Sequence, residues 1–391
     1  MAAIQNKSDK LLNSARTLVG VLFIFSGLIK ANDPLGFGYK LQEYFEVFHI
    51  TFLNGLAVPL SVTLCALEII FGAALLLGIR ALQVSWGLLL TIVFFTFLTF
   101  YSAAFDVVRT CGCFGDAIPL TPWQSFSKDI VLLILILYIF YKRKSIRPLI
   151  MSSGSQNMAL VLISLFAFGF GIYTYNFLPF KDFLPYHKGA SLPAYMKIPV
   201  GAPQDVYEIT YVLKHKGSGE TKKMTDKEYL STGIWKDSNW EVTGEPENKL
   251  VKKGYEAKIR DLKITDSQGT DYTSEIIENP YYNLIIVAYD LQKTNIKAIG
   301  DLNALAINAA ENYNIRTVLL TSASFSEAEG FRKKNRLVSE VFYADAVPLK
   351  SMVRANPGLL LLKEGVVIDK WHYNKLPSYE TLDETYLRKN P

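Results

Sequence analysis

The sequence predicts an α-helical membrane bundle followed by a soluble α/β domain. Long apolar runs occupy the first 177 residues, whereas the remainder is polar and its apolar residues fall in short runs. A helix of about 20 apolar residues crosses a bilayer core, and short strands that alternate with amphipathic helices indicate an α/β sheet. We expect a four-helix membrane domain at 1–150, a fifth transmembrane helix at 151–178, a β-rich linker module at 179–260 and a soluble domain at 261–391.

Five apolar runs predict five transmembrane helices, at residues 17–29, 52–79, 82–105, 130–141 and 158–177, with a start near Phe126 as the alternative for the fourth. No small-residue cleavage site follows the first run, and more runs come after it, which argues against a cleavable signal peptide. Residues 39–49 interleave aromatic and acidic side chains, a pattern typical of an interfacial helix.

The distribution of Lys and Arg predicts the orientation. With the N-terminus in the cytoplasm, eight basic residues lie in inner segments and four in outer ones, as the positive-inside rule requires. The inner residues are Lys7, Lys10, Arg16, Arg80, Lys142, Arg143, Lys144 and Arg147, and the outer ones are Lys30, Lys40, Arg109 and Lys128. Five crossings then place the C-terminal domain outside, so we expect a multi-pass bacterial inner-membrane protein with a periplasmic C-terminal domain.

The soluble part shows a regular alternation of strands and helices. Residues 206–213 alternate as a strand does, and Ser324 is a candidate N-cap. The expected elements of the C-terminal part are strands at 283–289, 315–320, 341–343, 359–362 and 366–371 and helices at 296–312, 324–335 and 347–354. The net charge of +5 is spread along the chain, which excludes a nucleic-acid footprint.

Two of the three cysteines form the motif Cys111-Gly-Cys113, in a polar gap between the third and fourth runs. Disulfide exchange needs two thiols in reach of each other, and Gly112 gives the backbone freedom to bring them together. Arg109 is a candidate to stabilise a thiolate if it turns toward Cys111. The alternatives are a static disulfide that staples the loop and half of a metal site without partners. The four histidines show no metal spacing, so no metal is expected.

Further candidate site residues lie in or near the apolar runs. Glu68 is in the middle of the second run, where a charged group is costly and usually functional. It could relay a proton or stabilise a quinone headgroup, or be a neutral glutamic acid bonded to a neighbouring helix. Cys65 lies on the same helix face and suits a packing role, with a third redox thiol as the alternative. Lys30, Asp33 and Tyr44 could line a headgroup or quinone site, or be snorkelling and interfacial residues.

The membrane part resembles the DoxX-like superfamily, and more closely its MauE branch, over residues 14–145. The matching stretches are Phe25-Ser-Gly-Leu-Ile-Lys30, Asp33-Pro34, Glu43-Tyr44, Leu67-Glu68-Ile-Ile-Phe-Gly72, Leu77-Gly78 and Cys111-Gly-Cys-Phe-Gly115. This resemblance implies a four-helix core that acts in thiol–disulfide or quinone-linked electron transfer. The fifth helix would then be an addition that delivers the C-terminal domain to the outer side.

The chain from Leu262 resembles a thioredoxin-like domain. Asn356-Pro357 precedes two predicted strands, where thioredoxins place their cis-proline. The place of the thioredoxin Cys-x-x-Cys is taken by Asp290-Leu-Gln-Lys293, so the resemblance implies binding rather than redox chemistry in this domain. The whole arrangement resembles DoxX-like proteins of the Bacteroidetes that have a C-terminal thioredoxin-like domain.

Our leading hypothesis is a thiol–disulfide redox protein of the inner membrane. Cys111 and Cys113 would exchange with a periplasmic protein that docks on residues 261–391, and electrons would pass to or from a quinone near Glu68. The alternative is a non-enzymatic membrane scaffold with a structural Cys-Gly-Cys disulfide. Solute transport is disfavoured because the sequence shows one intramembrane acid and no inverted repeat.

Overall fold

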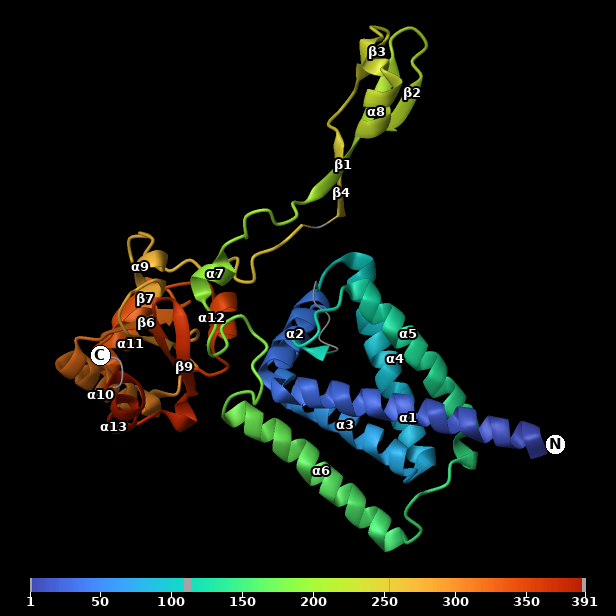
Figure 1. Ribbon diagram of the computed structural model, residues 1–391, viewed down its shortest axis with the longest axis horizontal. Coiled ribbons are helices and arrows are strands. Elements are labelled where there is room, and N and C mark those ends of the chain that lie inside the picture. The colour runs from blue at the N-terminus through green and yellow to red at the C-terminus, as the bar shows by residue number, and fades with distance from the viewer. Residues whose placement is uncertain (1, 109–113, 253, 389–391) are drawn as a thin grey trace. The chain divides into compact units, whose positions relative to one another are not determined.

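The computed structural model describes residues 2–108, 114–252 and 254–388, with side chains from residue 10 onward. The chain forms two compact units (Figure 1). One unit combines Met1–Ala190 with Leu262–Pro391, and the other is Ser191–Asp261. The membrane helices and the C-terminal α/β region (residues 262–388) therefore belong to a single unit. The finer domain boundaries expected from the sequence stay predictions.

Among the described residues, five helices are long and apolar enough to cross a membrane. They are α1 (Ala2–Asn32), α3 (Ala57–Leu77), α4 (Ala81–Phe105), α5 (Pro122–Lys142) and α6 (Ser153–Asn176). The five predicted runs are confirmed as helices, but α5 begins eight residues before its apolar run. The reason is a capping box between Thr121 and Gln124, with Pro122 in the first turn, which starts the helix in the polar gap.

Close contact of α1 and α3 sets the centre of the bundle. A Cβ atom added at Gly72 would lie 2.7 Å from the backbone oxygen of Gly20, so small residues are needed where these backbones approach. Helix α5 packs on α4, and α6 packs on α3. One end of the bundle, which we call the loop end, includes Asn32 and residues 106–108 and 114–121. The other, the basic end, includes Arg80 and residues 142–147.

The half-polar segment after α1 forms the predicted additional helix, α2 (Pro34–Val47). The backbone N–H of Gly36 donates to Asp33 Oδ1 at 2.9 Å, and Pro34 occupies the first turn. The N-cap and the first-turn proline thus both mark the start of α2. The Ser61 hydroxyl of α3 donates to the Pro34 carbonyl at 2.7 Å. These contacts hold α2 against the loop end of the bundle.

The C-terminal α/β region is built on a mixed sheet of order β7-β6-β5-β8-β9. Strands β5, β6 and β7 are parallel, whereas β8 is antiparallel to both β5 and β9. The strands are β5 (Asn283–Val287), β6 (Arg316–Thr321), β7 (Glu340–Tyr343), β8 (Gly358–Lys363) and β9 (Val366–His372). The helices are α9 (Thr273–Ile277), α10 (Ile296–Tyr313), α11 (Phe325–Asn335), α12 (Ala346–Met352) and α13 (Tyr379–Leu382).

Both faces of this sheet are covered (Figure 1). Leu284 and Ile286 pack with α10 in the main apolar cluster, while Ile285 and Val287 point to the other face and are also fully buried. Buried strands of this kind read as continuous apolar runs, which is why the sequence located them. The Asn356-Pro357 peptide before β8 is cis.

The unit Ser191–Asp261 has a four-stranded antiparallel sheet in which β1 pairs with three other strands. The strands are β1 (Val206–His215), β2 (Thr221–Thr225), β3 (Trp240–Val242) and β4 (Glu247–Lys252), with α7 (Leu192–Met196) before them and α8 (Asp226–Thr232) after β2. The strand predicted at 206–213 is confirmed as part of β1.

Candidate functional site

The structure leaves three of the predicted site residues undescribed. Arg109, Cys111 and Cys113 lie outside the described residues. The description resumes at Phe114, whose side chain is buried, and continues into Gly115 and Asp116. The surroundings of these neighbours therefore define the candidate site.

Lys30 and Glu68 form an ion pair inside the bundle. Lys30 Nζ bonds to Glu68 Oε1, and each residue is only 2% exposed. The ammonium also lies 4.5 Å from the centre of the Phe95 ring, an attractive cation–π position. Lys30 thus extends into the bundle and not toward water. Glu68 of α3 does bond to a neighbouring helix, α1, but its partner there is the Lys30 ammonium. Sequence spacing had not connected these two residues.

A second pair lies across from the first. Lys128 Nζ is 2.5 Å from Asp129 Oδ1, and the Thr99 hydroxyl donates to Asp129 Oδ2 at 3.0 Å. Asp129 is buried. Sequence reasoning missed Asp129 because the apolar run is taken to begin at Ile130, one residue after it. The capping box that starts α5 at Pro122 was the available signal, since it places Asp129 two turns inside a helix.

Tyr44 and Cys65 belong to one buried apolar cluster of the bundle. The Tyr44 hydroxyl and Ser102 Oγ are 2.8 Å apart, and the Tyr44 ring stacks on Phe48. Cys65 is fully buried with a free thiol. The structure therefore gives Tyr44 a packing and hydrogen-bonding environment, separate from the site that the sequence suggested for it.

A cleft of about 390 Å³ opens at the loop end. Its walls come from α2, from Gly115 and Asp116, from residues 179–184 and from α12. We call it the loop-end cleft. Lys30 and Asp33 line it, as does Tyr39. The cleft has the size of a typical small-molecule site and brings together segments that are far apart in the sequence.

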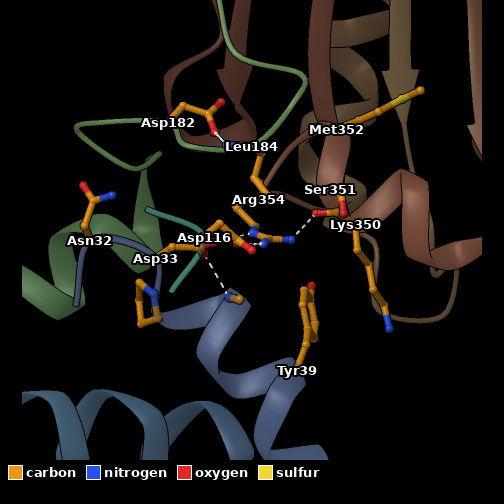
Figure 2. A network of polar contacts seen from close by, with 12 residues as sticks. Asn32, Asp33, Tyr39, Asp116, Asp182, Leu184, Lys350, Ser351, Met352 and Arg354 are labelled. Atoms are coloured by element: carbon orange, nitrogen blue, oxygen red, sulfur yellow. Dashed lines mark hydrogen bonds and ion pairs between the residues drawn. The ribbon is translucent and has the colours of Figure 1, made fainter. Parts of the chain in front are cut away.

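Arg354 is the central residue of this cleft (Figure 2). It is 6% exposed; its Nε lies 2.8 Å from Asp33 Oδ2, and its Nη2 lies 3.7 Å from Asp116 Oδ2. Its Nη1 also donates to the Lys350 carbonyl at 2.6 Å. Burial lowers the pKa of the Arg354 guanidinium, but the charge and hydrogen bond of Asp33 outweigh it and raise the pKa above its ordinary value.

Two further contacts join the same surfaces. Lys370 of β9 forms an ion pair with Asp182 and donates to the Met352 carbonyl at 3.1 Å. The hydroxyls of Tyr39 and Tyr289 are 2.9 Å apart. Burial lowers the pKa of Lys370 in spite of the charge of Asp182. Arg354, Lys370 and their acids are remote in sequence, and the sequence offered no signal that pairs them.

A smaller cavity lies within the bundle, between the two ion pairs, and we call it the inner cavity. Phe114 lines the inner cavity, whereas Gly115 and Asp116 line the loop-end cleft, and Lys30 contributes to both. The chain that follows Cys113 thus runs between two charged spaces. Groups of three or more metal-binding side chains are absent from the residues with described structure.

Comparison with known proteins identifies the membrane part. Residues 8–142 match the family described as methylamine utilisation protein MauE, so this stretch is a MauE-type domain, as the resemblance implied. Protein TlpB of Flavobacterium psychrophilum is 31% identical over 140 residues, which are 34% of this chain and 38% of that protein. The chain therefore aligns with little more than a third of the curated relative. With five apolar helices, it is a multi-pass membrane protein.

Proposed function

We propose that the protein is a thiol–disulfide redox protein of the bacterial inner membrane. In this proposal Cys111 and Cys113 form the redox pair and face the periplasm together with the C-terminal α/β region. The observation that supports it best is the position of Phe114, Gly115 and Asp116, which directly follow Cys113 and lie between the loop-end cleft and the inner cavity. The MauE-type domain and the alignment with TlpB support a role at the membrane.

The chemistry balances as a dithiol–disulfide exchange. A thiolate of the reduced partner attacks the Cys111–Cys113 disulfide and forms a mixed disulfide, and the second partner thiol resolves it. The partner leaves oxidised, and the Cys111–Cys113 pair gains two electrons and two protons. The reverse sequence oxidises the pair at the expense of a partner disulfide. Arg354, which is held protonated near Asp116, supplies positive charge beside a residue that follows the cysteine pair in the sequence.

A quinone is the cofactor that the sequence suggested. The inner cavity beside Glu68 has a volume of about 20 Å³, far too small for a quinone ring. The loop-end cleft is large enough, and Lys30 and Asp33 line it, whereas Tyr44 does not. A quinone site at Glu68 therefore does not fit, and the redox proposal stands on the cysteine pair without a quinone step.

We further propose that the C-terminal α/β region is a thioredoxin-like binding domain. The order of its five strands and the cis Asn356-Pro357 peptide support this assignment. Its sequence has no cysteine, and Asp290-Leu-Gln-Lys293 follows the first core strand. The surface beside the cis-proline already contacts Tyr39 and Asp33 of the chain itself. A protein partner would dock at the rim of the loop-end cleft, which Gly115 and Asp116 line.

Redox trapping in native membranes tests the proposal. Acid quenching, alkylation of free thiols and mass spectrometry should show Cys111 and Cys113 in both reduced and oxidised forms. Cys111→Ser or Cys113→Ser should then accumulate a mixed disulfide with a partner. Cys65→Ser is the matched control, because Cys65 is buried and free, and it should behave as the wild type. A permanently oxidised pair, with both loop variants unchanged in function, would contradict redox cycling.

The second candidate function is a membrane scaffold with a structural disulfide. Two observations favour it. Residues 262–391 contain no cysteine, so this region has no thiol chemistry of its own. The buried ion pairs of Arg354 and Lys370 fix its position against the rest of the unit. A partner that co-purifies with the chain equally well before and after Cys111→Ser and Cys113→Ser would support the scaffold. Loss or covalent trapping of that partner would support redox exchange.

A further inference from the structure

The loop-end cleft lies where two membrane-spanning helices end. Asn32 is the last residue of α1, and Pro179 follows α6, which ends at Asn176; both Asn32 and Pro179 line the cleft. Phe180 is exposed and stacks on Tyr173 of α6, with the ring centres 5.1 Å apart. Exposed aromatic side chains at the end of a span are typical of the membrane–water interface. The cleft is therefore at the depth of the lipid headgroups, whose phosphates are the neighbouring anions.

Most charged side chains that line the cleft are already in ion pairs. The described pairs are Lys30–Glu68, Asp33–Arg354, Asp116–Arg354, Lys40–Glu43 and Asp182–Lys370. Three other lining groups have no ion pair among the described residues, the cations Lys181 and Lys350 and the acid Glu46. These three groups together carry a net positive charge, which favours an anionic ligand.

Lys350 of α12 is the cation best placed to hold an anion. Its Nζ lies 4.7 Å from the centre of the Tyr39 ring and 6.0 Å from that of the Tyr289 ring (Figure 2). The side chain is half-buried. Burial lowers the pKa of Lys350, and the positive charge of Lys293 adds to the decrease. An ammonium in such surroundings is stabilised by a bound anion.

Lys181 brings a second ammonium to the cleft from a distant segment. Its backbone is fixed to the end of α1, because Asn32 Nδ2 donates to the Lys181 carbonyl at 2.7 Å and the Lys181 N–H donates to Asn32 Oδ1 at 3.2 Å. The Lys181 residue is exposed. A phosphate has oxygens enough to accept charge-assisted hydrogen bonds from more than one ammonium.

The cleft also has an apolar side, formed by the bundle. Ile29 of α1 and Phe37 of α2 line it, and Phe37 is buried. A free phosphate ion would gain nothing from these two side chains. A phospholipid would, because its glycerol backbone and the first methylenes of its acyl chains are apolar enough to pack on them. The lining thus combines cations for a phosphate with an apolar surface for the rest of a lipid headgroup region.

We propose that the loop-end cleft binds the headgroup of a membrane phospholipid, with the phosphodiester at Lys350 and Lys181. The glycerol backbone lies against Ile29 and Phe37, and the acyl chains stay in the bilayer. The site needs neither cysteine, so it is independent of the proposed redox function. It also assigns a ligand to the two lysines, which the redox proposal does not use.

Lysine footprinting of the full chain tests this site without any substitution. The protein in dodecyl maltoside, a detergent without phosphate, is acetylated briefly with an amine-reactive ester, and mass spectrometry measures the modification of each lysine. Dihexanoyl phosphatidylglycerol, a soluble phospholipid, should slow the acetylation of Lys350 and Lys181 several-fold. Lys333, an exposed lysine of α11, should react at an unchanged rate.

Inorganic phosphate at the same concentration separates the two sources of the ligand. It should protect Lys350 and Lys181 much less than the phospholipid does. Equal protection by inorganic phosphate would overturn the lipid assignment in favour of a free anion. No protection of Lys350 by either compound would overturn the site itself.

Phosphorus NMR titrations with the same phospholipid measure its Kd for variants of the full chain. Lys350→Gln should weaken binding by roughly 10-fold or more, as expected for the loss of one charge-assisted hydrogen bond. Lys350→Arg keeps the cation and should restore most of the affinity, which separates loss of charge from a folding defect. Lys333→Gln is the matched control and should bind as the wild type does. Wild-type affinity in Lys350→Gln would overturn the proposal.

Discussion

Arg354 offers the sharpest test of how the C-terminal α/β region is bound to the membrane helices. Arg354→Met keeps much of the side-chain length but removes the ion pairs to Asp33 and Asp116 and the hydrogen bond to the Lys350 carbonyl. Asp33 would then face the loop-end cleft without its cation. Because Arg354 is buried and its partner Asp33 is 321 residues away in the sequence, the substitution acts mainly on tertiary contact.

Arg354→Met should weaken the contact between the C-terminal α/β region and the membrane helices by about 2–3 kcal/mol. Removal of one partner from a buried ion pair costs about 3–5 kcal/mol. A value at or below the lower end of that range applies here, because water partly screens the acids: the side chain of Asp33 is 19% exposed and that of Asp116 is 50% exposed. Asp33 also keeps its bond from the Gly36 backbone N–H. A loss of about 2–3 kcal/mol raises the population of the opened contact by roughly 30- to 150-fold.

Hydrogen exchange with mass spectrometry measures this change locally. Amides of α2 and α12 should exchange faster in Arg354→Met, while those of α10 should be unaffected. Arg332→Met is the matched control: Arg332 pairs with Glu329 on the surface of α11, and exposed pairs of this kind are worth less than about 1 kcal/mol.

A double-mutant cycle with Asp33→Asn decides whether the ion pair is responsible. If the pair stabilises the contact, the two substitutions together should cost clearly less than the sum of their separate effects. Strict additivity, or unchanged exchange in α2 and α12, would refute the reasoning.

Three other predictions follow from separate parts of the molecule. Burial lowers the pKa of His372 from its ordinary value of 6.5 to about 4. The stability of the C-terminal α/β region should therefore be full above pH 6.5 and fall by about 2 kcal/mol as the pH drops from 6.5 to about 4. His372→Gln should flatten this loss in acid unfolding curves. Gly72→Leu should force α1 and α3 apart at Gly20, cost more than about 1–3 kcal/mol and lower the melting temperature. Tyr44→Phe should cost about 1 kcal/mol by loss of the Ser102 contact, and Ser102→Ala added to it should cost little more.

Much of the secondary structure could be predicted because it depends on local patterns. Each apolar run became a helix, since a long apolar segment has one way to satisfy its backbone in a bilayer. The N-cap predicted at Ser324 is observed with a full capping box to Glu327. The start of α5 was misplaced because apolar periodicity alone ignores the polar first turns that a capping box adds.

The sequence by itself determined the membrane helices, the positions of strands and helices along the C-terminal part, and the presence of an acid, Glu68, within a membrane span. Only the tertiary structure decided which charges meet. Lys30 pairs with Glu68, which is 38 residues away in the sequence, and Arg354 pairs with Asp33, which is 321 residues away. The energy of an ion pair depends on the distance between the charges and on their burial, and neither quantity is written in a local pattern. The same reason explains why Asp182 and Lys370 escaped the sequence analysis.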